Sequence, residues 1–374
     1  MTSDLFFTEI EKQYQNKLPF VAYRKPNEAL INALMQHTDD VFSINDYSEI
    51  GFVFAPFNST KDTTVFIPLE KSKAISCQHP QLVENYKTYD EYQPLETDRQ
   101  QHLQLVKKGI DVIKDGQIQK VVLSRVEKVA HQAEQPIEIF KDLLQHYTTA
   151  FVYFWYHPKV GMWLGATPET LIQLEGSRFK TMSLAGTQKY HGTKEVMWQN
   201  KEKEEQQFVT DFIVNSLKPF TTSLTISDVE TIKAGNILHL KTSISGILNL
   251  KNTSLKQVLL ALHPTPAVCG LPKERAKEFI LKQENYNREY YTGFLGELNI
   301  QKKITRNTNR RNVENNAYAS VKKVSNLFVN LRCMQILDKK ACIYVGGGIT
   351  TDSDPEAEWQ ETVAKAEVMK KVLQ

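Results

Sequence analysis

Residues 346–365 read GGGITTDSDPEAEWQETVAK, and this stretch says more about the fold and its purpose than any other. Three successive glycines allow a tight turn and a close approach of the backbone to a ligand, because no Cβ is in the way. After Pro355 the spacing is helical and places Glu358, Glu361 and Lys365 on one helical face. Two interpretations stay open here: a site for a metal or an anion, or a hairpin turn followed by a solvated amphipathic helix.

Outward from this stretch, segments rich in Val, Ile, Phe and Tyr recur along the chain and predict strands. These segments are 51–57, 63–68, 120–129, 151–157, 171–174, 179–184, 224–232, 237–247, 290–300 and 324–345. Fewer segments have helical spacing, namely 98–114, 136–146, 194–217, 272–283 and 355–373. Long runs of strands with occasional helices favour an α+β fold over regular βαβ alternation.

The composition is that of a folded protein with an ordinary surface. The chain has 374 residues, of which 41% are apolar and 10% aromatic, and its formal net charge is +3. So small a charge does not by itself indicate a nucleic acid or an anionic membrane as partner. We expect one large domain over residues 1–374, with a supporting part in residues 1–93 and the chemistry in residues 94–374.

The cysteines and the N-terminus point to a cytoplasmic protein. Cys77, Cys269, Cys333 and Cys342 are scattered without a CxxC pair, so neither a zinc site nor a disulfide framework is expected. The first ten residues contain acids, and no run of eighteen apolar residues occurs anywhere. We therefore expect neither a signal peptide nor a membrane span.

Residues 302–323 form a basic, asparagine-rich stretch with the single acid Glu314. A nucleic-acid surface would need aromatic side chains that stack on bases, and only Tyr318 is available. We expect an exposed loop here and no nucleic-acid partner.

The predicted helix at 194–217 carries an acid on its apolar side. Glu205 lies one turn before Phe208 and Val209. A buried carboxylate must pair with a cation, bind a metal or sit at the edge of the stripe. Glu205 is thus either an edge residue beside Lys201, or part of an all-oxygen Mg²⁺ site together with Glu358 and Glu361.

Four further residues could do chemistry, and each has a plainer alternative. Lys120 opens a strand, where it is either a general base or a strand-end lysine. Glu169, in the turn GATPE, is either a proton donor or a solvated glutamate. Arg332, in a mostly apolar strand, binds either a ligand carboxylate or an internal acid. His263, which follows a predicted helix and enters a loop with two prolines, is either a helix-terminal contact or a catalytic group.

Together these segments resemble the chorismate-utilising enzymes, the family of isochorismate synthase, salicylate synthase and component I of anthranilate and aminodeoxychorismate synthases. The matching motifs occur in the family's order between residues 120 and 365. They are KVVLSR at 120–125, GATPE at 165–169, LAGT at 184–187, KEKEEQQFV at 201–209, HPTPAVCG at 263–270, YYTGFLGEL at 290–298, NLRCMQI at 330–336, GGGIT at 346–350 and EAEWQETVAK at 356–365.

The resemblance implies an α+β fold in which two antiparallel β-sheets with flanking helices enclose a central, Mg²⁺-dependent active site. It assigns Lys120 as base and Glu169 as acid. The metal residues would be Glu205, Glu358 and Glu361. The residues that contact substrate would be Gly186, Thr187, His263, Tyr291, Arg332, Gly347, Gly348 and Lys365.

Three positions divide this family. Anthranilate synthases generally lack a lysine at the position of Lys120, so its presence favours water as the nucleophile. Ala185 stands where aminodeoxychorismate synthases carry a nucleophilic lysine, so covalent capture is not expected. Gln206 stands where many relatives have histidine, which leaves the metal ligand in place but alters its surroundings.

Within the family the resemblance therefore favours reversible conversion of chorismate to isochorismate. Salicylate synthesis, which adds pyruvate elimination, is the alternative, and a non-catalytic protein that binds a small anion is the alternative of another class. We expect a monomer that needs no glutamine amidotransferase partner. The sequence leaves open whether the product feeds menaquinone or siderophore synthesis.

Overall fold

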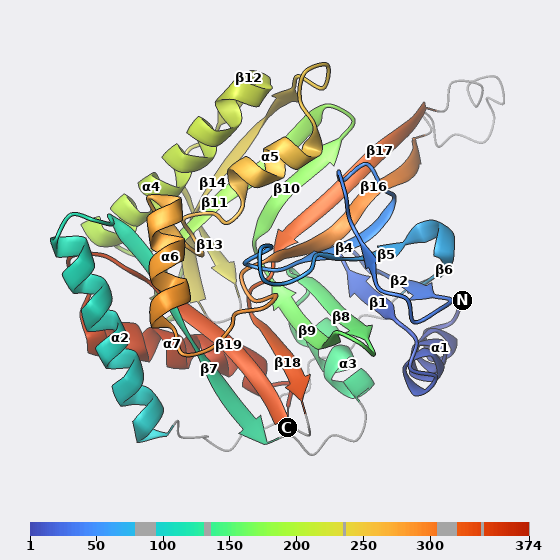
Figure 1. Ribbon diagram of the computed structural model, residues 1–374, viewed down its shortest axis with the longest axis horizontal. Helices are drawn as coiled ribbons and strands as arrows, with labels where there is room; N and C mark the ends of the chain where they lie inside the picture. The colour runs from blue at the N-terminus through green and yellow to red at the C-terminus, as the bar shows by residue number, and fades with distance from the viewer. Residues whose placement is uncertain (79–94, 131–135, 235–236, 305–319, 338–339, 374) are drawn as a thin grey trace.

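The computed structural model describes residues 1–78, 95–130, 136–234, 237–304, 320–337 and 340–373, which form two antiparallel sheets (Figure 1). The first sheet has the order β15 (Gly270–Leu271), β7 (Lys120–Ala130), β19 (Lys340–Ile349), β18 (Cys333–Leu337), β9 (Gly161–Thr167), β8 (Phe151–His157), β1 (Phe20–Arg24), β2 (Leu30–Gln36) and β6 (Ser72–Gln78). The second has the order β12 (Thr221–Ile226), β14 (Ile237–Leu248), β11 (Arg178–Lys189), β10 (Thr170–Glu175), β17 (Ser320–Val329), β16 (Phe294–Ile304), β4 (Gly51–Ala55), β5 (Val65–Pro68) and β3 (Phe42–Ser43), and β13 (Glu230–Ala234) pairs with β14.

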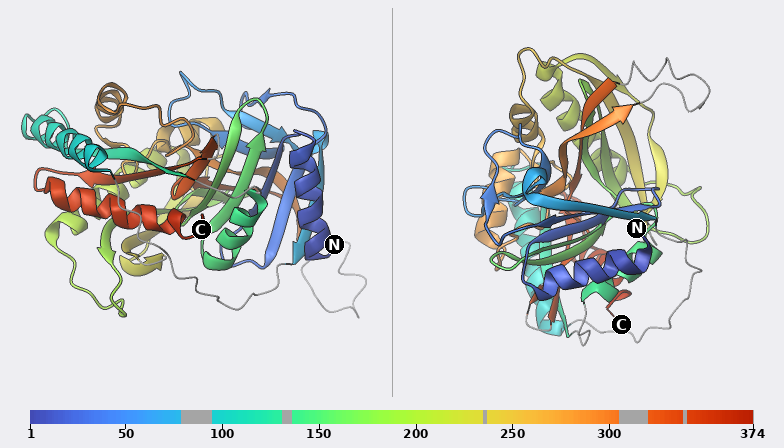
Figure 2. Two further views of the ribbon diagram at one scale, coloured as in Figure 1. Left: turned by 90° about the horizontal axis from the view of Figure 1, so that it is seen from below. Right: turned by 90° about the vertical axis from the view of Figure 1, so that its right-hand side faces the viewer.

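Helices cover the outer faces of both sheets (Figures 1 and 2). Helices α1 (Ser3–Gln15), α3 (Pro136–His146) and α7 (Pro355–Lys370) share one apolar cluster with the first sheet. Helices α4 (Asn200–Leu217) and α5 (Leu255–Leu262) pack on the second sheet. Helices α2 (Glu96–Lys114) and α6 (Lys273–Gln283) pack around β7 and the end of β19. The prediction of an α+β fold with two antiparallel sheets and flanking helices is confirmed.

An aromatic core joins the inner faces of the two sheets. Phe151 of the first sheet stacks on Phe328 of the second, with ring centroids 4.2 Å apart. Phe54 stacks on Tyr290 at the same 4.2 Å separation. Such ring pairs contribute about 0.5–1.5 kcal/mol beyond the area they bury. The core thus fixes the two sheets against each other.

The N-terminal part of the chain contributes strands to both sheets. Strands β1, β2 and β6 extend the first sheet, and β3, β4 and β5 extend the second. The described residues 1–78 thus belong to the same two sheets as the rest of the described chain. Among the described residues, no helix is long and apolar enough to cross a membrane.

Several predicted elements differ from the structure; the predicted strand 224–232, for example, is divided between β12 and β13. The apolar run 324–345 is not one strand but parts of β17, β18 and β19, because the chain turns between sheets within it. Helix α4 begins at Asn200 rather than at residue 194. Of the basic stretch, residues 305–319 lie outside the described residues.

The chain passes between the two sheets at two adjacent points. Glu169 lies where the chain leaves β9 for β10, and Arg332 lies where it leaves β17 for β18. The two crossings are hydrogen-bonded to each other: Val329 N donates to Glu169 O at 3.0 Å, and Ala166 N donates to Arg332 O at 3.0 Å. Residues predicted to act together are thus brought together by the topology.

Gly346, Gly347 and Gly348 lie in strand β19, paired with Ser124, Leu123 and Val122 of β7, and none has a positive φ. The interpretation as a hairpin turn is wrong, since the strand ladder continues through the glycines to Ile349. What the glycines supply is the space that a Cβ would fill.

Candidate active site

A cavity between the two sheets is lined by residues from most of the predicted motifs. Ten predicted site residues line it: Glu169, Gly186, Thr187, Glu205, Tyr291, Arg332, Gly347, Gly348, Glu361 and Lys365. Its free space is about 100 Å³, below the 300 Å³ or more usual for ligand pockets. A ring-sized ligand would therefore require lining side chains to move.

The three predicted metal carboxylates converge on Gly347 and Gly348. A Cβ on Gly348 would lie 2.4 Å from Oε1 of Glu205. A Cβ on Gly347 would lie 3.1 Å from Oε2 of Glu358 and 3.5 Å from Oε1 of Glu361. Acids from α4 and α7 thus meet against the backbone of Gly347 and Gly348, which we call the glycine floor.

Each of these carboxylates is paired with a lysine. Glu205 Oε1 lies 2.8 Å from Nζ of Lys120, and Glu361 Oε1 lies 2.6 Å from Nζ of Lys365. Burial alone would raise the pKa of Glu205, but the ammonium groups of Lys120, Lys365 and Lys201 outweigh it and lower that pKa. The site therefore holds an ionised carboxylate in a largely buried place.

The alternative interpretation placed Glu205 at the edge of the stripe beside Lys201, but Lys201 pairs with a different acid. Its Nζ lies 2.5 Å from Oε1 of Glu358, a side chain that is 1% exposed. Burial and the nearby charge of Glu361 raise the pKa of Glu358. Because Lys201 reaches from α4 to α7, it joins the two helices that carry the acids.

The acidic residues fit a hard divalent cation. Among the described residues, no three His, Cys, Asp or Glu side chains stand together as a metal cluster. In the pairs above, each of the three carboxylates has one oxygen turned toward a lysine. Oε2 of Glu358 is nevertheless buried without a hydrogen-bond partner, and it faces Gly347. Glu205, Glu358 and Glu361 offer only oxygen ligands, which is the set that Mg²⁺ prefers.

Lys120 is fully buried at the start of β7. Its Cε lies 3.0 Å from where a Cβ of Gly348 would stand, so it shares the glycine floor with Glu205. It does not line the open part of the cavity.

Glu169 is 4% exposed and faces the same cavity. Burial raises the pKa of Glu169 to about 8, although Lys120, Arg332 and Lys365 pull it down. Near neutral pH this carboxyl is therefore largely protonated and can donate a proton.

Arg332 is held by a residue that sequence reasoning missed. Its guanidinium donates to Nε2 of His239 at 2.9 Å, and Nδ1 of His239 lies 2.8 Å from the carbonyl oxygen of Gly186. Burial, and then the charge of Arg332, lower the pKa of His239 to about 3. The imidazole is thus neutral, with its proton on Nδ1, and connects Arg332 to the LAGT segment.

Gly186 and Thr187 lie at a β-bulge of β11, where the register with β14 shifts. Gly186 has φ +69°, which favours glycine, and its N–H donates to Oε2 of Glu205 at 3.2 Å. The bulge therefore turns backbone groups toward the cavity.

Lys365 and Tyr291 complete the wall on the side of β19. Nζ of Lys365 donates to the carbonyl oxygen of Gly346 at 3.0 Å. The hydroxyl of Tyr291 lies 3.1 Å from where a Cβ of Gly346 would stand, and its ring stacks on Tyr344. Both side chains offer hydrogen-bond donors to an anion.

His263 does not line the cavity. Its ring packs edge-on against Phe294, with centroids 5.0 Å apart, and burial lowers its pKa to about 3. His263 thus lies outside the lining of the cavity, beside the apolar cluster under α4 and α5 to which Phe294 belongs. We remove His263 from the proposed site.

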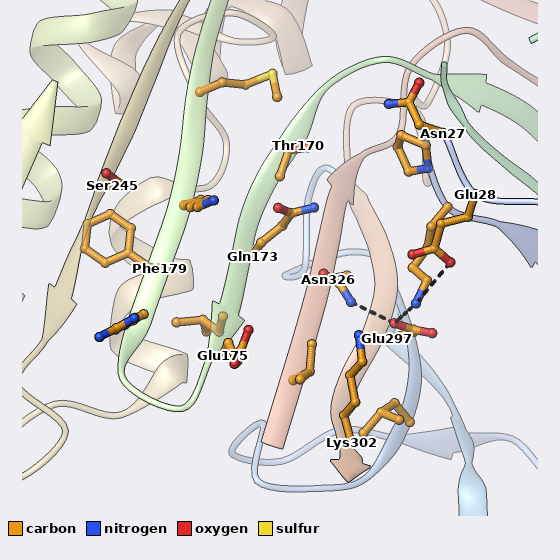
Figure 3. Close-up of a pocket in the computed structure, with 18 of the residues that line it drawn as sticks. Asn27, Glu28, Thr170, Gln173, Glu175, Phe179, Ser245, Glu297, Lys302 and Asn326 are labelled. Atoms are coloured by element: carbon orange, nitrogen blue, oxygen red, sulfur yellow. Dashed lines mark hydrogen bonds and ion pairs between the residues drawn. The ribbon is translucent and has the colours of Figure 1, made fainter. Parts of the chain in front are cut away.

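A larger groove, of about 1200 Å³, opens elsewhere between the sheets (Figure 3). Its central acid, Glu297, accepts hydrogen bonds from Tyr23 at 2.7 Å and from Asn326 at 2.8 Å, and Lys25 lies 3.5 Å away. That carboxylate is satisfied within the protein. None of the predicted site residues is among the described residues that line this groove, so the smaller cavity is the candidate active site.

Comparisons with known proteins agree with this architecture. The sequence profile of chorismate binding enzymes matches residues 55–304, and a second profile of that description matches residues 317–371. Isochorismate synthase MenF of Pasteurella multocida is 30% identical over 74% of this chain and 62% of its own length. Isochorismate synthase DhbC of Bacillus subtilis is 27% identical over 72% of this chain and 66% of its own length. The chain thus aligns with less than two thirds of either relative.

A crystal structure of DhbC from Bacillus anthracis superposes with a TM-score of 0.78 at 23% identity, covering 98% of this chain and 99% of that one. At such identity the likeness shows the fold. With the profile match over most of the sequence, the chain belongs to the chorismate binding enzyme family, and the predicted resemblance is confirmed.

Proposed function

We propose that this protein is an isochorismate synthase, which interconverts chorismate and isochorismate with the help of Mg²⁺. The observation that carries the proposal is a buried lysine, Lys120, packed against Gly348 in the wall of the same cavity that a buried carboxyl, Glu169, lines. A protein that only binds an anion does not need this base and acid. The isochorismate synthases among its relatives support the same reaction.

The reaction exchanges one hydroxyl for another on the ring. The free amine of Lys120 would take a proton from a water molecule that attacks C2, so the ammonium that pairs with Glu205 must first give up its own proton. Glu169 would give its proton to the hydroxyl that leaves C4, so that water departs and the double bonds shift. For this, Nζ of Lys120 must turn from Glu205, 2.8 Å away, to the attacking water. The same two groups in exchanged roles would run the reaction backward.

The remaining residues would bind the two carboxylates of chorismate. Arg332, oriented by His239, and Tyr291 would hold the enolpyruvyl carboxylate. Lys365 and the backbone around Gly186 and Gly347 would surround the ring carboxylate. Bound Mg²⁺, held by Glu205, Glu361 and Glu358, would neutralise charge on that carboxylate and fix the ring.

Glu169→Gln is expected to lower kcat by about 10²–10⁴-fold, because glutamine cannot donate a proton to the leaving hydroxyl. Chorismate affinity is expected to change little, which calorimetry with this variant would measure. Wild-type kcat is expected to fall as pH rises through about 8, where Glu169 loses its proton. An alkaline limb that stays flat to pH 9.5 would contradict the acid role.

The same group predicts a pH dependence of stability. The pKa of Glu169 is raised from 4.5 to about 8, so the folded protein binds the proton more tightly than the unfolded chain does. Relative to Glu169→Gln, the free energy of unfolding of the wild type is expected to fall as pH rises from about 4.5 to about 8. Denaturant titrations at several pH values would check this; a constant difference would contradict the burial argument.

Gly348→Ala is expected to weaken Mg²⁺ binding by about tenfold or more, which is the typical effect of changing a group that orients a metal ligand. The new methyl would lie 2.4 Å from Oε1 of Glu205, which must move. That oxygen ends a flexible side chain, so the melting temperature is expected to fall little. Titration calorimetry with Mg²⁺ would test this. Gly176→Ala, at an open turn with φ +60°, is the control: its backbone strain is expected to lower the melting temperature and to leave Mg²⁺ affinity unchanged. Unchanged Mg²⁺ affinity in Gly348→Ala would contradict the glycine floor.

Product analysis tests the proposal as a whole. Purified protein, chorismate and Mg²⁺ are expected to give isochorismate in equilibrium with chorismate. Salicylate with pyruvate would instead identify a salicylate synthase, and binding without turnover a non-catalytic anion binder. We further propose that the protein acts as a cytoplasmic monomer without an amidotransferase partner.

A further inference from the structure

A buried ion pair lies directly behind the wall of the cavity. Glu284 is the C-cap residue of helix α6, and Arg288 lies four residues further along the chain. Both side chains are 2% exposed. Nε and Nη2 of Arg288 donate to the two carboxylate oxygens of Glu284 at 2.8 and 2.6 Å, in the two-pronged geometry of a strong pair. Helix α6 stands beside β7 in Figure 1, which places the pair next to the strand that carries Lys120.

Every N–H donor of Arg288 has an acceptor. Besides the two bonds to Glu284, Nη2 donates to the carbonyl oxygen of Val122 at 2.7 Å. Nη1 donates to the carbonyl oxygen of Val268 at 2.9 Å and to Oγ1 of Thr292 at 3.3 Å. A guanidinium has five N–H donors in a fixed fork, so this one is fully used.

The acceptors belong to three separate parts of the cavity wall. Val122, Val268 and Thr292 all line the cavity. Glu284 extends the network, since Oε1 accepts from both N and Oγ of Ser124, at 2.8 and 2.7 Å. The guanidinium also lies 5.8 Å from the ring centroid of Tyr291. One ion pair therefore connects strand β7, the loop after α5 and the turn that holds Tyr291.

Stability alone does not explain this arrangement. The cost of burying two charges often cancels their attraction, and an apolar pair of similar volume can be equally stable. What an apolar pair cannot do is fix three backbone segments at defined hydrogen-bond distances. A displacement of about 1 Å in a catalytic group can lower the rate by about 10²-fold.

We propose that Glu284 and Arg288 are positioning residues that set Lys120 and Tyr291 relative to each other by holding the wall segments at Val122–Ser124, Val268 and Thr292. The catalytic part of this inference rests on the proposed function, whereas the structural part does not. Neither residue lines the cavity, so neither is a catalytic residue.

The test compares Arg288→Lys and Glu284→Gln with Arg24→Lys. Lysine keeps the positive charge but lacks the planar, forked set of N–H donors of arginine. Arg24 is a matched control because it is 3% exposed and donates to the carbonyl oxygens of Leu144 and Tyr147, none of which lines the cavity. For each protein we would measure melting temperature, kcat, KM for chorismate, and amide hydrogen exchange of peptides spanning 121–125 and 290–293.

Arg288→Lys and Glu284→Gln are expected to lower kcat by about 10²-fold, with KM changed less than about threefold. Exchange is expected to rise in both peptides, most directly at the amide of Ser124, which donates to Glu284. Arg24→Lys is expected to lower the melting temperature similarly and to leave kcat and both peptides unchanged. The double variant is expected to be no slower than the worse single variant, because the two residues act as one unit.

Several results would overturn the inference. A folded Arg288→Lys variant with the same kcat and the same hydrogen exchange as the wild type would overturn it. An Arg24→Lys variant that loses as much kcat as Arg288→Lys would overturn it as well. If the wild type does not convert chorismate at all, the proposed function fails. In that case the exchange data still decide whether the pair holds the wall.

Discussion

Lys120→Ala is expected to lower kcat for chorismate by about 10²–10⁴-fold, the range typical of a lost general base. The side chain is fully buried, and the alanine that replaces it has no group that can take the proton from water. The same change removes the ammonium that lies 2.8 Å from Glu205. Mg²⁺ affinity is therefore expected to stay equal or to rise, since a competing cation is gone.

Steady-state kinetics and titration calorimetry with Mg²⁺ would measure both effects on one preparation. Lys201→Met is the matched control, because Lys201 is also paired with a metal carboxylate, Glu358, but has no part in the proton transfers. The control is expected to keep kcat within about tenfold. Full activity in Lys120→Ala would remove the base from the mechanism.

Glu361→Gln is expected to weaken Mg²⁺ binding by more than about 100-fold, since partners one shell further out are already worth 10–100-fold. The carboxylate of Glu361 faces Gly347 and lines the cavity. Glutamine offers one neutral oxygen in place of an anionic pair, so added Mg²⁺ is not expected to restore turnover. Binding would be followed by calorimetry in the absence of chorismate, which separates metal affinity from catalysis.

Glu356→Gln is the control on the same helix. Glu356 is paired with Arg99 at 2.6 Å, its side chain is 44% exposed, and it does not line the cavity. It is expected to bind Mg²⁺ as the wild type does. If Glu361→Gln bound Mg²⁺ with wild-type affinity, the all-oxygen site would have to lie elsewhere.

Periodicity was enough to place the acids. Helical spacing put Glu358, Glu361 and Lys365 on one face, and the structure brings that face to the cavity floor, opposite Glu205. The strand start at Lys120 was likewise visible in the apolar run that follows it. These features depend on neighbours in the chain, which the sequence displays directly.

Contacts between distant segments could not be predicted in the same way. The three glycines are compatible with a turn and with a strand that is crowded by neighbouring side chains, because both favour residues without a Cβ. The crowding comes from acids of α4 and α7, which are distant in the sequence. His239 sits in an alternating strand pattern, so its bond to Arg332 had no local signal beyond a polar residue in an apolar segment. The pairing of Lys201 with Glu358 rather than Glu205 also depends on how α4 meets α7.

The origin of the oxygen in the product tests the central claim most directly. The reaction would be run with chorismate and Mg²⁺ in H₂¹⁸O, and isochorismate would be analysed by mass spectrometry. Water attack at C2, with loss of the C4 hydroxyl, predicts one ¹⁸O atom per molecule, located at C2. Isochorismate that carries no ¹⁸O, or no isochorismate at all, would contradict the account.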